Sequence, residues 1–365
     1  MGNSWQSKIL VKSVPTPNSD EQVKFLVNIQ RLLAEGQFVA TYKYALLLAL
    51  ADIAVEKGRD DSAALEISTK QIAEKFIVYY WRQSQPYAPL NQKQFSILRQ
   101  NTARQAGIVS LVEEASRRYE GSITEAQLNI SEWRQLVSRV NQIVKVMPLW
   151  KLQTVGREKF DFLYENAGLG NSIQLKPHIA FCLRKFHGLV SDLVRGAWVR
   201  YVRRFNPDVL GSSKDLHEFL FGSERADLSD VANVLREVQG SQCFYCSGGL
   251  KSGAAHVDHF VPWSRYPVDL GHNFVLAHQT CNNSKSDRLA STEHLERWVN
   301  FIEVNGKALT AEFNRKKILN DLDTSIRITG WAYRQTFEAS GMNWIKGNQL
   351  QPLTSGWENI LAKLN

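Results

Sequence analysis

Four metal-binding side chains stand in two short pairs in the second half of this chain. Cys243 and Cys246 are separated by two residues, and so are His278 and Cys281. A two-residue gap lets one tight turn direct two side chains at the same tetrahedral ion. Brought together by the chain between them, the pairs supply the three thiolates and one imidazole of a closed zinc site. A lone CxxC is ambiguous, but the matched second pair favours structural Zn²⁺ over incidental buried cysteines.

The residues between and directly after these pairs could hydrolyse a phosphodiester bond. Asp258 offers a hard carboxylate oxygen suited to Mg²⁺ or Mn²⁺. His259 can be neutral near pH 7 and accept a proton from water. Asn273 and Asn282 carry amides that can fix an imidazole or coordinate a metal ion. Because the reaction needs an activated water and a cation that stabilises charge at phosphorus, these residues predict metal-dependent cleavage of a nucleic acid.

The order and spacing of these residues resemble the HNH endonucleases of the ββα-metal superfamily. The family has CxxC, Asp-His followed by a Pro, Asn-Leu-Val-Leu and CxxCNxxK, and this chain reads CFYC, VDHFVP, NFVLAHQTC and CNNSK. The resemblance implies that His259 is the general base, that Asn273 orients it, and that Asp258 and Asn282 hold the catalytic cation. It assigns the structural zinc to Cys243, Cys246, His278 and Cys281.

Two features depart from the family pattern. His278 stands where a cysteine is usual, which zinc accepts. The glycine pair common after the base is replaced by WSRYPVDLG, from Trp263 to Gly271, so the shape of this loop is not predicted. The local pattern predicts a strand at Ala255–Phe260, a strand at Asn273–Ala277 and a helix from about Asn282. The resemblance implies that the first strand ends at the Asp-His pair.

The rest of the sequence is mostly typical of helices, so we expect an α+β protein: a mostly α-helical chain that carries a small zinc-stapled ββα-metal module. Capping residues and apolar periodicity predict helices at Glu21–Glu35, Thr41–Lys57, Ser68–Tyr80 with Ser68 as N-cap, Gln92–Tyr119, Thr124–Met147, Ile179–Phe205, Leu216–Gly222, Ser229–Val238 and Thr292–Val304, with further helices to Asn365. The expected divisions are an N-terminal helical domain at 1–150, a linker and basic helix at 151–207, the HNH domain at 208–300 and a C-terminal helical segment at 301–365.

The predicted helix at Ile179–Phe205 is the most basic element, and Asp192 is its only acidic residue. Arg195, Arg200 and Arg203 fall within an arc of roughly 140° beside its apolar stripe. This face could contact DNA phosphates or only water, and the sequence leaves both open. In the HNH region, Arg265 and Lys285 are further candidates for phosphate contact, with a solvated side chain equally open.

Composition agrees with a nucleic-acid partner, because the net charge of the chain is +8. The first residues contain no apolar signal core, and the longest apolar run, Tyr44–Ala51, is far short of the ~20 residues that span a bilayer. We therefore expect no membrane insertion. Three of the four cysteines lie in the one predicted metal site, which indicates a reducing cytoplasm.

A second resemblance lies ahead of the metal-binding pairs. The run AFCLRKFHGLVSDLVRGAWVRYVRR is similar to bacterial HNH proteins of phage-defence and restriction functions, among them the HNH component of type II Zorya systems. It implies a DNA endonuclease or nickase in anti-phage defence, with other components of a defence system as partners. The alternative is a non-catalytic, zinc-stabilised DNA-binding module. The four-residue Asp, His, Asn, Asn set favours catalysis, because binding alone needs none of them together.

Overall fold

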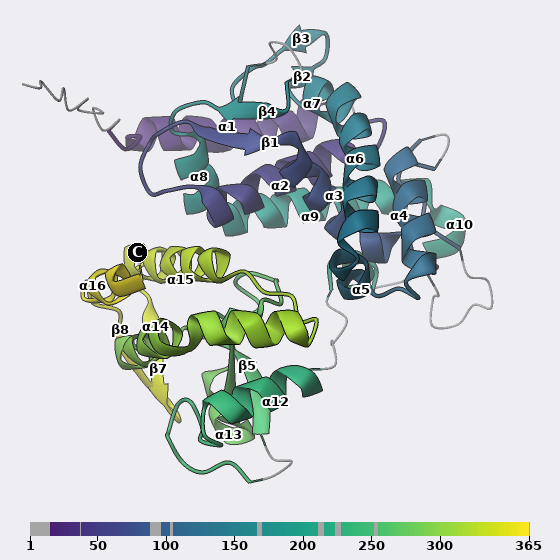
Figure 1. The fold of residues 1–365 in the computed structure, drawn as a ribbon. Coiled ribbons are helices and arrows are strands. Elements are labelled where there is room, and N and C mark those ends of the chain that lie inside the picture. Colours follow the sequence, from purple (N-terminus) through teal and green to yellow (C-terminus); the bar gives the residue numbers. More distant parts are fainter. Residues whose placement is uncertain are drawn as a thin grey trace, which may run out of the picture.

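The structure of the chain, a computed structural model, describes residues 15–36, 38–87, 96–102, 105–165, 170–210, 215–222, 228–251 and 255–364. Helices dominate these residues, and the strands form small antiparallel two-stranded sheets (Figure 1). The predicted α+β class is therefore confirmed. No helix among the described residues combines the length and apolar composition that crossing a membrane requires.

Helix α2 (Tyr42–Lys57) is the centre of the N-terminal part. It is apolar on all sides and buried along nearly its whole length, as expected for a helix that neighbours surround completely. Helices α3 (Thr69–Gln83), α8 (Ile179–Lys185) and α9 (His187–Phe205) pack against it. One hydrophobic core joins these helices, running from Phe25 to Leu220 and continuing across residue 150.

The other elements of this part cover or extend that core. The helices are α1 (Ser19–Glu35), α4 (Gly107–Arg118), α5 (Ile123–Leu128), α6 (Ile130–Val146), α7 (Pro148–Lys151), α10 (Pro207–Leu210) and α11 (Leu216–Phe221). Strand β1 (Leu65–Ser68) pairs with β4 (Ser172–Leu175), and β2 (Thr154–Val155) pairs with β3 (Glu158–Lys159).

The helix start predicted at Ser68 is confirmed, because its hydroxyl accepts a hydrogen bond from the backbone of Lys70. The helix predicted over Gln92–Tyr119 is wrong in its first half. Residues 92–95 lie outside the described part of the chain, and 96–102 are extended because their backbone bonds elsewhere: Thr41 N–H donates to Gln100 O at 3.0 Å. The single helix predicted at Ile179–Phe205 is broken at Phe186 into α8 and α9.

The C-terminal part holds the predicted ββα unit. Strand β5 (Ala255–His259) pairs with β6 (Phe274–His278), and α13 (Gln279–Lys285) follows directly. The 3₁₀ turn η1 (Gly271–Asn273) leads into β6. Helices α12 (Ser229–Val238) and α14 (Thr292–Arg315) pack against this unit.

The chain ends differently from the prediction of helices up to Asn365. After α15 (Leu322–Glu338) come strands β7 (Met342–Lys346) and β8 (Gln349–Pro352), then α16 (Trp357–Leu361) and η2 (Ala362–Leu364). Gly347, with φ +48°, makes the tight turn of this hairpin, a conformation that glycine adopts without strain. Trp344 of β7 is buried and bonds its backbone to Leu289, which fixes the hairpin to the ββα unit.

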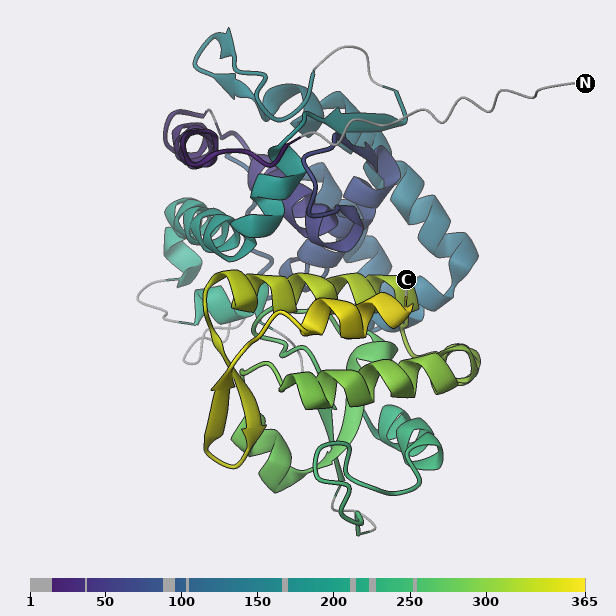
Figure 2. The same cartoon turned by 90° about the vertical axis from the view of Figure 1, so that its left-hand side faces the viewer.

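Helix α15 joins the two parts of the molecule. It lies on the side of the C-terminal part that faces the N-terminal helices (Figures 1 and 2) and packs against α2. Its Trp331 donates from Nε1 to the carbonyl of Arg184 at 2.9 Å. Arg184 and Arg334 both pair with Asp60, each at 2.9 Å. Apolar contact and ion pairs therefore hold the parts together.

Candidate metal and nuclease centre

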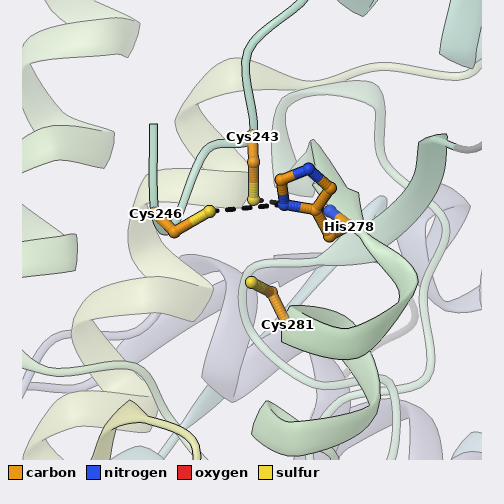
Figure 3. Close-up of side chains that lie close together, drawn as sticks. All are labelled: Cys243, Cys246, His278 and Cys281. Atoms are coloured by element: carbon orange, nitrogen blue, oxygen red, sulfur yellow. Dashed lines mark hydrogen bonds between the residues drawn. The ribbon is translucent and has the colours of Figure 1, made fainter. Parts of the chain in front are cut away.

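The two predicted zinc pairs converge on one point. Cys243 and Cys246 come from the turn before β5, His278 ends β6, and Cys281 lies in the first turn of α13 (Figure 3). Their ligand atoms all lie within 4.8 Å of one another. Ligands at about 2.3 Å from a tetrahedral ion lie within such a distance of each other, so the cluster fits one zinc ion.

The chemistry of the donor atoms also fits a cation. Burial acts to raise the pKa of Cys243, but backbone hydrogen bonds from Cys246 and His278 outweigh it and hold the pKa below its usual value. Burial, and then the negative charges of Cys243 and Cys246, raise the pKa of Cys281 to about 12. Three close thiolates repel one another, so a divalent ion at their centre would remove this conflict. The Cys₃His cluster therefore indicates structural zinc.

Pairing of β5 with β6 places Asp258 and His259 at the end of a strand. Asp258 lies opposite Val275, and His259 lies opposite Phe274. Because successive side chains of a strand point to opposite faces, the carboxylate and the imidazole enter different surroundings. The strand ends at His259, as the resemblance implied and one residue before the end predicted from the local pattern.

Asp258 forms a buried ion pair with Lys285. The Lys285 ammonium lies 3.0 Å from Asp258 Oδ2, and its side chain has no exposed surface. The hydroxyl of Tyr245 donates to the same carboxylate oxygen. Burial lowers the pKa of Lys285, although the charge of Asp258 opposes that change. Lys285 also donates to the carbonyl of His259 at 2.8 Å, so this lysine fixes the backbone of the pair as well.

This position corrects the expectation that Lys285 contacts phosphates. The ammonium is enclosed between Asp258, His259 and the ring of Tyr245, where DNA cannot reach it. A buried lysine avoids the cost of an unpaired charge only with such partners. The residue therefore belongs to the internal support of the site.

His259 bonds to a residue that the sequence did not single out. Its Nε2 lies 2.6 Å from Asp269 Oδ1, with 20% of the His259 side chain and 38% of the Asp269 side chain exposed. Phe274 packs edge-on against the imidazole at 4.7 Å between ring centres. Asp269 lies within WSRYPVDLG, the segment that departs from the family pattern, so its role was not predicted. Tyr245 lies between the two zinc cysteines of CFYC and was not predicted either.

Asn273 does not bond to the imidazole, contrary to the role that resemblance implied. Its Oδ1 accepts from Val261 N–H at 2.9 Å and its Nδ2 donates to Val261 O at 3.0 Å. Both groups of the amide therefore bond to the backbone of Val261, two residues after His259. Asn273 fixes the start of the loop rather than the ring of the base.

The remaining predicted residues occupy varied positions. Asn282 lies on α13, half-buried and three residues before Lys285, so the two share a helix face. Arg265 is mostly enclosed and donates to Thr336 Oγ1 at 3.0 Å, and burial lowers its pKa. His272 is buried and bonded to Gly306 O and Thr310 Oγ1, so it has a packing role.

The basic face of α9 lies on the N-terminal part, in helix residues whose other side is core. Arg200 and Arg203 are exposed. Arg195 is half-buried, with its guanidinium 5.6 Å from the centre of the Phe221 ring. Cys182, the cysteine outside the cluster, is a buried thiol whose pKa burial raises to about 12.

Two family models match the chain. The model described as Domain of unknown function (DUF8808) matches residues 22–220, which include the N-terminal core. The model described as HNH endonuclease matches residues 243–288, from the first zinc cysteine through α13. No curated protein matches the chain. The HNH match and the Cys₃His cluster together support an HNH-type nuclease module.

Proposed function

The chain belongs to the family described as Domain of unknown function (DUF8808), and we propose that it is a metal-dependent endonuclease that hydrolyses phosphodiester bonds in DNA. The observation that carries this proposal is the Asp258–His259 pair at the end of β5, beside the zinc-type cluster and within the HNH match. The non-catalytic DNA-binding alternative has no observation of its own in its favour.

The donor set fits a hard divalent cation. Asp258 would hold Mg²⁺ or Mn²⁺ together with Asn282, since carboxylate and amide oxygens suit these ions. Tyr245 and Lys285 both engage Asp258 Oδ2, which fixes the direction of the carboxylate. The bound ion would stabilise negative charge on the phosphate and on the leaving oxygen.

His259 supplies the proton acceptor of the proposed reaction. A water oxygen forms the new bond to phosphorus, the bond from phosphorus to the leaving sugar oxygen breaks, and the proton of that water passes to the imidazole. Solvent then protonates the leaving oxygen. The partial exposure of His259 lets water and a DNA strand approach it.

Plasmid cleavage tests the proposal. Purified protein should nick or cut supercoiled DNA with Mg²⁺ or Mn²⁺, stop in EDTA and recover when the ion is restored. His259→Ala should lower the cleavage rate by ~10²–10⁴, the usual effect of losing a general base, without weakening DNA binding. DNA that is bound but never cut, with either ion, would instead establish the DNA-binding alternative. Parallel reactions with RNA decide the substrate.

We extend the proposal to anti-phage defence or restriction in the bacterial cytoplasm, with other defence components as partners. Its support is the resemblance of residues 180–204 to HNH proteins of those functions. Cells that express the wild-type chain together with its neighbouring genes should give fewer plaques than cells that express His259→Ala. Equal plaque counts across a panel of phages would refute this extension while leaving the nuclease proposal intact.

A further inference from the structure

The loop between His259 and η1, residues 260–270, touches both parts of the molecule. At its start, Asn273 fixes Val261 through two hydrogen bonds. At its end, Gly271 N–H donates to Leu319 O at 2.9 Å. A Cβ at Gly271 would come within 2.6 Å of the Phe313 ring, so only glycine fits this close approach. The loop is therefore fixed at both ends inside the nuclease module.

The middle of the loop is fixed by the other part of the molecule. Tyr266 is buried, with only 3% of its surface exposed, and its hydroxyl donates to Glu56 Oε1 of α2 at 2.8 Å. Its ring lies against His187 of α9 and Trp331 of α15, at 5.6 and 5.9 Å between ring centres. Burial, followed by the charge of Glu56, raises the pKa of Tyr266 well above its usual value, so the hydroxyl keeps its proton and donates.

The acceptors of Tyr266 are themselves held by N-terminal helices. Lys75 of α3 donates to the same oxygen of Glu56 at 2.6 Å. One turn earlier on α2, Asp52 bonds His187 at 2.7 Å and Tyr79 at 2.6 Å. A tyrosine that enters such a set of buried partners cannot shift without leaving several polar groups unpaired.

Asp269 lies three residues after Tyr266 in the same loop. The fixed position of Tyr266 therefore limits where the Asp269 carboxylate, and the His259 ring bonded to it, can lie. An ionised carboxylate only accepts hydrogen bonds, so His259 donates from Nε2 to Asp269 Oδ1. The lone pair of a neutral imidazole is then on Nδ1, the nitrogen that is left to take the proton of water. The carboxylate also stabilises the imidazolium that this transfer creates, as in other carboxylate–histidine pairs.

We propose that Asp269 is a positioning residue for His259, and that the N-terminal domain sets its position by holding Tyr266. The proposal rests on the proposed nuclease function. It assigns the N-terminal domain a part in catalysis that does not depend on contact with DNA. A merely structural loop would predict changes in stability without a specific change in the cleavage rate.

The experiment is a double-mutant cycle measured in single-turnover cleavage of plasmid at saturating protein. Asp269→Ala should lower the rate about 10- to 100-fold, the scale on which carboxylate partners of histidines contribute elsewhere. Tyr266→Phe keeps the ring and removes only the hydroxyl, so it should give a smaller loss. In the double variant, Tyr266→Phe should add little, because its effect passes through Asp269. DNA affinity should not weaken in any variant.

Two controls match these changes. Tyr164→Phe removes a buried hydroxyl that donates to Leu149 O at 2.8 Å in the N-terminal core, far in sequence from the loop. Glu312→Ala removes a half-buried acid of α14 that pairs with Arg315. Both should cleave at the wild-type rate.

The outcomes separate this inference from the nuclease proposal. A wild-type protein that cuts no nucleic acid refutes the proposed function. A wild-type protein that cuts, with Asp269→Ala cutting equally fast, refutes only the positioning role. If Tyr266→Phe lowers the rate by the same factor with and without Asp269, the link through Asp269 is wrong. The melting temperature of each variant is compared with that of the wild type, and an unchanged value excludes unfolding as the cause of a lower cleavage rate.

Discussion

Lys285 is one of two buried side chains, with Tyr245, that hold the Asp258 carboxylate. Its charge is buried, paired with Asp258 and bonded to the backbone of His259. A pair of this kind contributes little net stability compared with apolar side chains, but breaking it leaves an uncompensated charge. Its value is therefore in directing Asp258, since Tyr245 and Lys285 occupy one carboxylate oxygen and hold the group in one orientation.

Lys285→Met should lower the free energy of unfolding by about 3–5 kcal/mol, because Asp258 then remains buried without a counter-charge. Adding Asp258→Asn should restore part of that loss. The control is Lys363→Met, which removes a partner of Glu296 at an exposed pair and should cost at most ~1 kcal/mol. Denaturant titrations measure all three. Equal losses at Lys285 and Lys363 would contradict the buried pair.

At the scale of elements, the zinc-type cluster joins the turn before β5, the end of β6 and the start of α13. Asp258 lies on β5, Asn273 in η1 directly before β6, and Asn282 on α13, so the cluster ties together the segments that carry them. The sheet has only two strands, and such a unit is not stable by itself in water. A metal ion at the cluster therefore supplies stability that the small sheet lacks.

Cys281→Ser should reduce bound zinc from about one ion per chain and lower the melting temperature, because metal binding contributes directly to folding at such sites. Cys182→Ser is the matched control, since it alters a buried thiol outside the cluster and should keep the zinc. Elemental analysis and thermal unfolding measure both effects. Full zinc content in Cys281→Ser would remove that cysteine from the ligand set.

Helix α9 supports a second prediction at this scale. Arg200→Ala with Arg203→Ala should reduce the slope of log affinity against log salt by ~0.9 for each phosphate that an arginine no longer neutralises, on unrelated duplex sequences alike. Arg117→Ala with Arg118→Ala removes the same charge from exposed sites that pair with glutamates, and should leave the slope unchanged. If both double variants keep the wild-type slope, α9 does not contact the DNA backbone.

The sequence predicted the elements whose signals are local. Spacing of CFYC and HQTC indicated the zinc cluster, and the local pattern at Ala255–Phe260 and Asn273–Ala277 indicated β5 and β6. The hairpin after α15 was missed, because MNWIK carries no clear alternation, and its strand pairs with β8 and is held by a backbone bond to Leu289. Asp269 could not be assigned, since its contact with His259 depends on the path of a loop whose Tyr266 is held by Glu56 in the N-terminal part. The expected division at residue 150 stays a prediction.

At the scale of the whole molecule, Asp52 is a junction between the helices of the N-terminal part. Burial acts to raise its pKa, but the hydrogen bond and charge of His187 outweigh this and lower the pKa to about 2. A carboxyl with a depressed pKa in the folded state stabilises the protein above the pKa of the unfolded chain, near 3.9. That stabilisation is lost as pH falls toward 2.

The free energy of unfolding should therefore decrease between about pH 5 and pH 2, with Asp52 contributing about 2 kcal/mol of the decrease. In Asp52→Asn, stability should be lower at pH 7 and this part of the pH dependence should be absent. Asp61→Asn, at an exposed carboxyl, provides the control. Identical pH profiles for the wild type and Asp52→Asn would show that Asp52 is not held in its charged form.

The entry of Tyr266 into the N-terminal helices limits how such genes can recombine. A nuclease module moved onto an unrelated partner would carry Tyr266 and Trp331 with it, and would lose the Glu56 carboxylate and the Arg184 carbonyl that accept their hydrogen bonds. A chimera would then expose two aromatic rings and release the loop that holds the base. Exchange between relatives should succeed when helix α2 and the loop are inherited together, so that the two parts of the molecule behave as one unit of inheritance.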